Sequence, residues 1–397
     1  MSYDNNGNKT SQSYYNANDK PAEYNKEGYA KYTLRYDDRG NTIEWAYYDV
    51  NNHLAMCSRG YAKQVHRYDA WRNQVEEHSY NTDGHLVKSS DGCAIALAQY
   101  DGYGKTKLLT SLGADGKPCK TPFGIAYLEY NRSISNDWVE EVYRDEKGKK
   151  TLCKDGYYKE ISKYDNRGNL REVIYYGTNN RLITAKDGYA RKVNKYDERG
   201  LLIEESYYGA DNQLIVSKDG YARKRSMYND KGLLTEVLYY RTDGKLRKTG
   251  YARVRYQYNN EGRKNQEEYY ERNGKPYSAP YSYASRTYTY THDGNLASDR
   301  RYDYRGRELT DMVIIGEVFD GQGKKLGLQQ GDIILRYAGE AVTVANAKAF
   351  VDALGKPGTE KRELLIQRGE QLKTYAVDPG KLGVRLVDAW VAVGKTK

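Results

Sequence analysis

The sequence predicts a mainly β protein, in which an elongated, solenoid-like array of antiparallel β-hairpin repeats is followed by a small α+β domain. Three observations lead to this fold class. A Gly-Tyr-Ala tripeptide recurs at an almost constant spacing, tyrosine occurs 44 times against three phenylalanines, and tyrosine becomes rare from about Asp311 onward. Tyrosine suits half-buried β surfaces, because its ring packs across strands while its hydroxyl reaches water.

The repeat unit is 32 residues long, apart from one step of 30 residues. Copies of Gly-Tyr-Ala or a close variant begin at Gly28, Gly60, Gly92, Gly124, Gly156, Gly188, Gly220 and Gly250, with a degenerate copy at Ser282. Such a constant register is typical of repeat architectures, in which each unit contacts mainly its neighbours. The sequence therefore predicts tandem repeats over residues 1–308, about nine units in all.

Each unit contains a Tyr-Asp-x-x-Gly element, a glutamate and usually a Tyr-Tyr pair. The aspartate accepts local backbone hydrogen bonds and the glycine supplies a positive φ, so this element predicts a hairpin turn between two strands. Residues 3–21 match the second half of a unit, so the first unit is partial. We expect the chain to be part of a longer array rather than to begin with a natural cap.

The units that begin at Gly92 and Gly124 depart from this pattern, and the second places its Tyr130-Asn131 two residues early. We interpret the departure as sequence drift, the alternative being a surface adapted to a partner. The Tyr-Asp-x-x-Gly-Asn element resembles the YD repeats of RHS-type proteins, and the Tyr-Tyr-x-x-x-Gly portion resembles MORN-like repeats. Both families build β-hairpin arrays but neither has a 32-residue period, so the resemblance concerns hairpin chemistry alone.

The residue after Gly-Tyr-Ala is a cation in most units and predicts a basic stripe along a stacked array, formed by Lys31, Lys63, Lys159, Arg191, Arg223 and Arg253. Arginine and neighbouring tyrosine rings are the groups that contact phosphates and stack on bases or sugars. Binding of a nucleic acid or glycan is therefore one interpretation. The other is a solvated face whose charges are balanced internally by the repeated acidic residues, and we favour it.

No catalytic or metal-binding pattern is visible in the sequence. The repeated glutamate is structural in our interpretation, because acid–base catalysis needs one carboxylate pair in one cleft. The five histidines lack metal-ligand spacing, and the four cysteines form no C-x-x-C pair. We therefore expect no enzyme activity, no cofactor and no metal. No signal peptide or membrane-length apolar segment is visible, and we expect a cytoplasmic location.

Residues 309–397 predict a separate small domain with its own core. The segment 343–354 predicts a short amphipathic helix with Thr343 or a neighbouring residue as cap and Gly355 at its end, and two strands joined by an Arg-Gly-Glu turn follow it. The run Leu326-Gly-Leu-Gln-Gln-Gly-Asp-Ile-Ile-Leu335 resembles the G-L-x-x-G-D-x-I-L signature of bacterial, protease-associated PDZ domains. The resemblance covers nearly all of residues 311–387.

The PDZ resemblance implies capture of a peptide as an added strand, with a loop of the type Φ-G-Φ binding the terminal carboxylate. Residues 307–312, where this loop normally lies, do not contain it. Leu382, Gly383 and Val384 have the right character, and the resemblance implies a groove between them and the helix 345–354. Alternatively, this last strand completes the sheet and closes the groove.

Three functions are compatible with these patterns. The first is a non-enzymatic interaction scaffold, in which a repeat arm carries a peptide-binding module for a protein or peptide C-terminus. The second is a repeat surface that binds a nucleic acid or glycan, with the PDZ-like domain as a cap. The third is the C-terminal regulatory part of a larger protease or effector.

Overall fold

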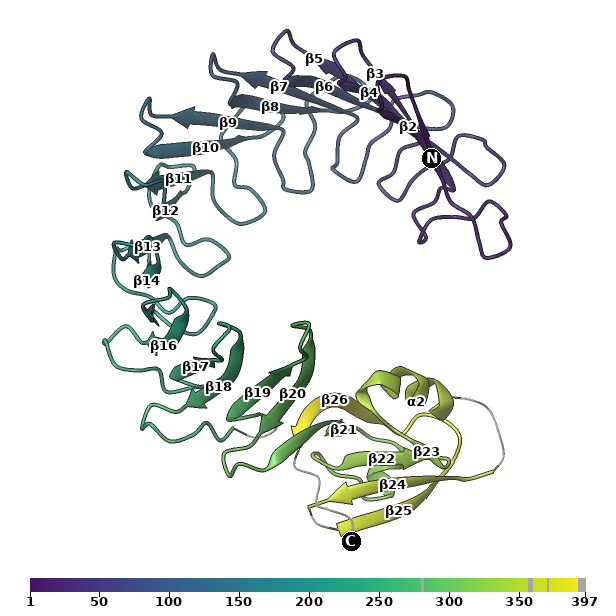
Figure 1. Ribbon diagram of the computed structural model, residues 1–397, viewed down its shortest axis with the longest axis vertical. Coiled ribbons are helices and arrows are strands. Elements are labelled where there is room, and N and C mark those ends of the chain that lie inside the picture. Colours follow the sequence, from purple (N-terminus) through teal and green to yellow (C-terminus); the bar gives the residue numbers. More distant parts are fainter. Residues whose placement is uncertain (280–281, 356–359, 370, 392–397) are drawn as a thin grey trace. The chain divides into compact units, whose positions relative to one another are not determined.

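The computed structural model describes residues 1–279, 282–355, 360–369 and 371–391 (Figure 1). The chain divides into two compact units, Met1–Arg223 and Lys224–Lys397. Within the described residues there are 26 β-strands and two short α-helices, which confirms the predicted mainly β fold. Glu370 in the predicted turn, and the end of the predicted domain at 392–397, lie outside the described residues.

The first unit consists of antiparallel hairpins, each strand pairing with its neighbours along the chain. Its strands are β1 (Ser2–Tyr3), β2 (Lys9–Ser13), β3 (Lys31–Tyr36), β4 (Thr42–Tyr48), β5 (Lys63–Tyr68), β6 (Gln74–Tyr80), β7 (Ile95–Tyr100), β8 (Thr106–Leu112), β9 (Tyr127–Arg132), β10 (Trp138–Arg144), β11 (Lys159–Tyr164), β12 (Leu170–Tyr176), β13 (Arg191–Tyr196) and β14 (Leu202–Tyr208).

The second unit begins with further hairpins and ends in the C-terminal domain. The first of these strands, β15, begins at the division between the units. The hairpin strands are β15 (Arg223–Tyr228), β16 (Leu234–Tyr240), β17 (Arg253–Tyr258), β18 (Lys264–Tyr270), β19 (Ser285–Tyr290) and β20 (Leu296–Tyr302). No helix among the described residues is long and apolar enough to cross a membrane.

Each Tyr-Asp-x-x-Gly element forms the tight turn that the sequence predicts. In the β13–β14 hairpin, Asp197 Oδ1 accepts hydrogen bonds from the backbone N–H of Arg199 at 3.0 Å and of Leu201 at 2.9 Å. Gly200 has a φ of 82°, in the left-handed region that a side chain disfavours. The repeated aspartate and glycine are therefore explained by turn geometry.

Stacked tyrosine rings form the interior of the repeats. The tyrosine of Gly-Tyr-Ala alternates with the first tyrosine of the Tyr-Tyr pair: Tyr157, Tyr175, Tyr189, Tyr207 and Tyr221 follow one another with ring centroids 4.3–5.7 Å apart. We call this row the tyrosine ladder. A second stretch of it in the first unit runs from Tyr29 through Tyr47 to Tyr61. Each hairpin thus packs on the next through aromatic contacts.

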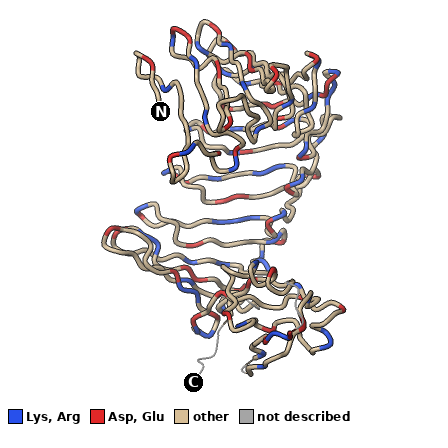
Figure 2. Tube along the Cα trace, turned by 90° about the vertical axis from the view of Figure 1, so that its right-hand side faces the viewer, with Lys and Arg blue, Asp and Glu red and all other residues tan. Residues whose placement is uncertain are grey.

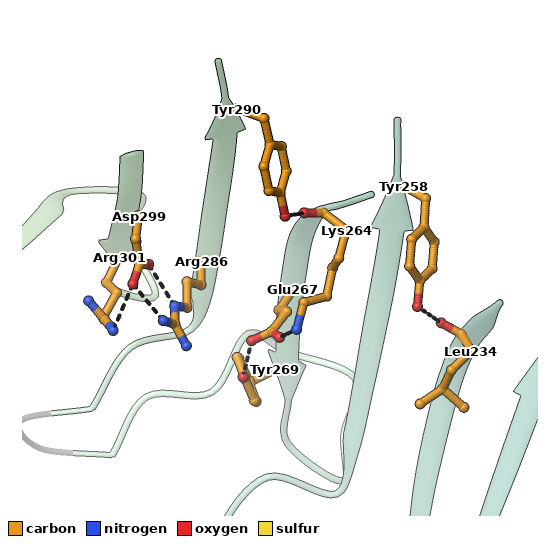
Figure 3. Close-up of polar contacts among 9 residues, drawn as sticks. All are labelled: Leu234, Tyr258, Lys264, Glu267, Tyr269, Arg286, Tyr290, Asp299 and Arg301. Carbon is orange, nitrogen blue, oxygen red and sulfur yellow. Dashed lines mark hydrogen bonds and ion pairs between the residues drawn. The ribbon is translucent and has the colours of Figure 1, made fainter. Parts of the chain in front are cut away.

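A second tyrosine, the last residue before the hairpin turn, ties neighbouring hairpins together. Its hydroxyl donates to the carbonyl of the first residue of a strand in the preceding hairpin. Figure 3 shows two of these bonds, Tyr258 to Leu234 at 2.8 Å and Tyr290 to Lys264 at 2.7 Å. Four more of these bonds join Tyr36 to Lys9, Tyr68 to Thr42, Tyr100 to Gln74 and Tyr196 to Leu170.

The hairpin of β9 and β10 corrects our placement of Tyr130-Asn131 as an early copy of the motif. Tyr130 lies inside β9, directly opposite Glu141. Arg132 occupies the position of the tethering tyrosine, and its guanidinium donates to the carbonyl of Thr106. The tether is therefore kept by a different side chain, which a search for tyrosine alone does not find.

The C-terminal domain is a five-stranded antiparallel sheet with a short helix. Its strands lie in the order β26, β21, β22, β24, β25, and β23 pairs with β22. The elements are β21 (Glu308–Val318), α1 (Gln322–Lys325), β22 (Ile333–Tyr337), β23 (Glu340–Ala341), the 3-10 turn η1 (Val344–Asn346), α2 (Ala347–Leu354), β24 (Arg362–Arg368), β25 (Gln371–Val377) and β26 (Val384–Val391).

An apolar core fills this domain, and Phe350 and Leu354 of α2 belong to it, as the sequence suggested. Thr343 caps the helical segment through a reciprocal pair of hydrogen bonds with Asn346. The first two residues of β21 pair with β20 and the rest with β26. The predicted boundary at residues 308 and 309 falls on this shared strand and stays a prediction.

Candidate functional site

The segment Leu382-Gly383-Val384 is held in place by the beginning of the domain. The carbonyl of Leu382 accepts a hydrogen bond from the N–H of Gly323 at 2.6 Å, and that of Gly383 accepts one from Phe319 at 2.7 Å. Gly383 has a φ of 71°, and a Cβ at this position would lie 3.0 Å from the carbonyl oxygen of Asp320. Glycine is therefore required here by both the backbone angle and the space.

The backbone N–H groups of this segment are candidates for binding a ligand. Within the described part of the chain, the N–H groups of Leu382 and Gly383 donate no hydrogen bond. The side chain of Leu382 is buried in the core of the domain, so the loop is anchored on its inner side. Two adjacent unpaired N–H groups on an anchored loop are the arrangement that binds a carboxylate.

Strand β26 continues from this loop as an edge strand. It pairs with β21 along one side, from Thr310 opposite Val391 to Val318 opposite Val384. No other strand pairs with β26 among the described residues. An edge strand presents a row of backbone N–H and C=O groups that an extended peptide can pair with.

The helix α2 flanks β26 (Figure 1), and both elements pack on one apolar core. Val384 and Leu386 of β26 and Ala347 of α2 are half-buried against the cluster that contains Phe350 and Leu354. Val351, one turn after Ala347, is 51% exposed. Val384, Leu386 and Ala347 therefore form an apolar surface where strand and helix meet the core.

A buried ion pair fixes the Gly-Asp of the sequence signature. Asp332 is 1% exposed and accepts hydrogen bonds at 2.6 Å from both Nε and a terminal nitrogen of Arg368. These bonds raise the pKa of the Arg368 guanidinium. Asp332 also accepts from the backbone N–H of Gln329 at 2.8 Å, so it joins β22, β24 and the loop before β22. The sequence showed the aspartate but not its partner.

The domain also has an apolar cavity of about 370 Å³ on the other flank of α2. Ala349 and Ala353 of the helix, Tyr337 and Val342 line it, together with Arg362. Arg362 donates to the carbonyl of Ala353 at 2.7 Å and so holds the end of the helix. The sequence gave no sign of this second concave surface.

The residues of the predicted basic stripe lie on the face opposite the tyrosine ladder, and four of them lie against a tyrosine of the same hairpin. Lys31 is 5.3 Å from the ring centroid of Tyr48, and Arg191 is 4.4 Å from that of Tyr208. Lys63 and Lys159 make the same contact. The Nε atoms of Arg191, Arg223 and Arg253 are buried and have no hydrogen-bond partner in the described residues.

The repeated glutamate neutralises several members of the stripe. Glu140 pairs with Lys159 at 3.3 Å, Glu172 with Arg191 at 3.0 Å, and Glu236 with Arg253 at 3.4 Å. Figure 2 shows lysine and arginine interleaved with aspartate and glutamate along the strands. Each glutamate thus bridges two hairpins, which gives it a structural role, while binding of an anionic partner by the stripe stays a prediction.

The remaining polar residues do not converge on a metal. Within the described residues, no three His, Cys, Asp or Glu side chains are grouped so that they could hold a metal ion. The four cysteines are free thiols, and three of them are buried in the repeats.

Comparisons with known proteins find a likeness only among solved structures; no family model and no curated protein matches. Two similar structures are crystal structures of TcdB2-TccC3, with 12% and 11% identity, TM-scores of 0.27 and 0.23, and 76% and 98% of this chain covered. A third is the Photorhabdus luminescens Tc holotoxin pore, with 12% identity, a TM-score of 0.19 and 86% covered.

This chain spans only 19%, 24% and 22% of the length of those three chains. With TM-scores below 0.5, these likenesses carry no argument about this chain.

Proposed function

We propose that this chain is a non-enzymatic interaction scaffold, whose PDZ-like terminal domain captures a protein C-terminus as an added strand along β26. The observation that carries the proposal is the edge of β26, which begins at the loop Leu382-Gly383-Val384 and runs beside α2. The repeats supply an arm of stacked hairpins that carries this module.

The proposed binding mode assigns a task to each part of the groove. The N–H groups of Leu382 and Gly383 receive the terminal carboxylate, and the backbone of β26 pairs with the peptide backbone. Val351 and Leu386 receive an apolar side chain near the peptide terminus. The peptide carboxylate and the peptide backbone both bind to backbone groups of this domain, which are the same for any peptide sequence. Specificity for one peptide therefore rests on the few side chains that line the groove.

The test is a binding screen of the full chain against a library of peptides with free C-termini, followed by titration of the tightest peptide. Val351→Glu places a charge on the groove flank of α2 without touching the core, since Val351 is exposed. We expect at least about tenfold weaker binding, because a carboxylate is introduced beside the peptide carboxylate. Amidation of the peptide C-terminus is expected to abolish binding.

Ala349→Glu is the matched control, because it adds the same charge to an exposed residue on the opposite flank of the same helix. Binding is expected to be unchanged in this variant. Loss of binding with Ala349→Glu but not with Val351→Glu would move the site to the 370 Å³ cavity. Failure of the whole library to bind contradicts the proposal.

The other functions considered from the sequence have less support. Several stripe cations are already paired with glutamate and tyrosine, which leaves fewer of them for a nucleic acid or glycan. We keep the absence of enzyme activity and the cytoplasmic location as parts of the proposal, and a hydrolase or transferase activity of the purified chain would contradict it.

A further inference from the structure

A cavity of about 520 Å³ lies in the first unit, on the face of the sheet that carries the tyrosine ladder. Rings from four successive strands and turns line it, among them Tyr29, Trp45, Tyr47 and Tyr61. Its size falls within the range of about 300–1,000 Å³ that is usual for small-molecule sites. None of the stripe residues lines it, and it is separate from the groove of the terminal domain.

The cavity lies where the tyrosine ladder stops. Tyr61 is the last ring of the N-terminal stretch, because the next two ladder positions hold Ser79 and Cys93 in place of tyrosine. Polar side chains from the same hairpin, Gln64 and Glu77, take part in the lining instead. Where the repeat pattern is broken, polar side chains therefore line the cavity in place of a stacked tyrosine ring. We call this polar part of the lining the polar floor.

The polar floor is built from two opposed residue pairs on β5 and β6. Gln64 lies opposite Ser79, and His66 lies opposite Glu77. Gln64 is 8% exposed and donates to Glu77 at 2.7 Å, and Glu77 accepts a second hydrogen bond from Gln74 at 3.2 Å. Both hydrogen-bond donors and acceptors therefore face a space walled by aromatic rings.

His66 is the unusual member of this floor. Its side chain is only 10% exposed, and neither ring nitrogen has a hydrogen-bond partner within the described residues. Nε2 lies 3.8 Å from Glu77 Oε2, which is too long for a hydrogen bond. Burial lowers the pKa of His66, although Glu77 and the carbonyl of Thr42 act in the opposite direction. A buried imidazole without a partner is costly unless something in the cavity pairs with it.

The charges of the lining select against anionic ligands. The lining holds two acidic side chains, Glu27 and Glu77, and one basic side chain, Arg59, while burial lowers the pKa of His66 and so favours its neutral form. Phosphate and carboxylate ligands therefore meet a net negative surface. An uncharged ring with several hydroxyls matches both the aromatic walls and the mixed donors and acceptors, because each hydroxyl donates and accepts.

We propose that this cavity binds a neutral saccharide, stacked on Trp45 and Tyr29 and hydrogen-bonded through its hydroxyls to Gln64, His66 and Glu77. Glu77 is the acceptor that orients the ring, and His66 gains a hydrogen bond from the bound ligand. The proposal does not depend on the function of the terminal domain.

The test begins with the full chain on an array of neutral oligosaccharides, followed by calorimetric titration of the tightest one, with choline chloride and inorganic phosphate as separate probes. Glu77→Gln keeps the shape but weakens the acceptor, and we expect about tenfold weaker saccharide binding. Trp45→Phe reduces the stacking surface, and we expect a several-fold loss.

Two neighbouring residues provide matched controls. Glu76→Gln makes the same change on the opposite face of β6, where Glu76 pairs with Arg67 at 3.2 Å. Trp71→Phe makes the same change at a tryptophan that is 82% exposed on a turn. Neither is expected to alter saccharide binding. The proposal is overturned if no neutral saccharide binds, if choline or phosphate alone binds, or if control and cavity variants weaken binding equally.

Discussion

The repeats and the C-terminal domain have interiors of different chemistry. Tyr175 and Tyr207 of the tyrosine ladder are 8% and 4% exposed, and their hydroxyls lie among other polar groups: that of Tyr207 donates to the buried Glu205. In the terminal domain the core side chains of Val313, Ile334 and Leu364 are 0% exposed, and none of them carries a polar atom.

This difference has consequences for how each region is stabilised. A hairpin of the repeats buries its rings only against the hairpins before and after it, so its stability is a sum of neighbour contacts. The main buried cluster of the terminal domain is shared by five strands and a helix, so losing one contact in it affects all of them. Tyrosine allows the repeats to combine ring packing with hydrogen bonds between hairpins, whereas the domain relies on apolar burial.

High pH is expected to separate the two regions most strongly. Burial raises the pKa of Tyr29 to about 12, and it also raises the pKa of Tyr175 and Tyr207. An unfolded tyrosine has a pKa of about 10, so the folded state retains protons that the unfolded state loses. The stabilisation is complete below pH 10 and is lost as the pH rises through the folded values.

Hydrogen exchange across β11–β14 and across β22–β26, measured from pH 7 to about 11, tests this prediction. We expect protection in the repeat strands to fall first, since several ladder tyrosines ionise together. Equal loss of protection in both regions at the same pH would show that the ladder does not control alkaline stability.

Removal of Arg368 is the next largest expected effect, and it acts on the terminal domain. Arg368→Ala leaves the carboxylate of Asp332 buried without its cation, and breaking such a pair costs about 3–5 kcal/mol. Urea unfolding of the full chain, followed by exchange in β22 and β24, measures the change. Arg336→Ala is the control, since Arg336 is an exposed residue of β22. The repeat strands are expected to keep their protection in both variants.

Most of the repeat architecture was predictable from the sequence, because its causes are local. Asp197 and Gly200 form their turn within five residues, and tyrosines equivalent to Tyr196 and Tyr207 recur at the same place in most units of the 32-residue register. Turn chemistry and spacing are both visible in a sequence. The helix cap at Thr343 was predictable for the same reason.

Features that depend on distant partners were not predictable. Arg132 takes the place of a tethering tyrosine because its guanidinium reaches the same carbonyl position, 26 residues away. Arg368 pairs with Asp332 across 36 residues, and the exposure of Val351 follows from how α2 sits on the core. The cavity beside Tyr61 depends on the absence of tyrosine at positions 79 and 93, which hold serine and cysteine. Its shape arises only when the hairpins stack.

The smallest predicted effect concerns the tyrosine hydroxyl bonds that tie neighbouring hairpins together. Among the described residues, the terminal domain has no equivalent of these bonds. Tyr100→Phe removes the hydroxyl that donates to the carbonyl of Gln74 at 2.8 Å, and we expect a loss of about 1 kcal/mol. Tyr196→Phe is expected to cost about half as much, because Asn194 also donates to the carbonyl of Leu170, at 2.8 Å.

Urea unfolding of the two variants, with Tyr103→Phe as a control at an 88% exposed residue, measures these differences. A tether acts between two neighbouring hairpins, so the change in exchange is expected to centre on the strands that it joins: β6 and β7 for Tyr100, and β12 and β13 for Tyr196. An equal loss across all strands of the first unit would mean that the repeats unfold as one cooperative body, and the contrast with the terminal domain would then rest on chemistry and not on cooperativity.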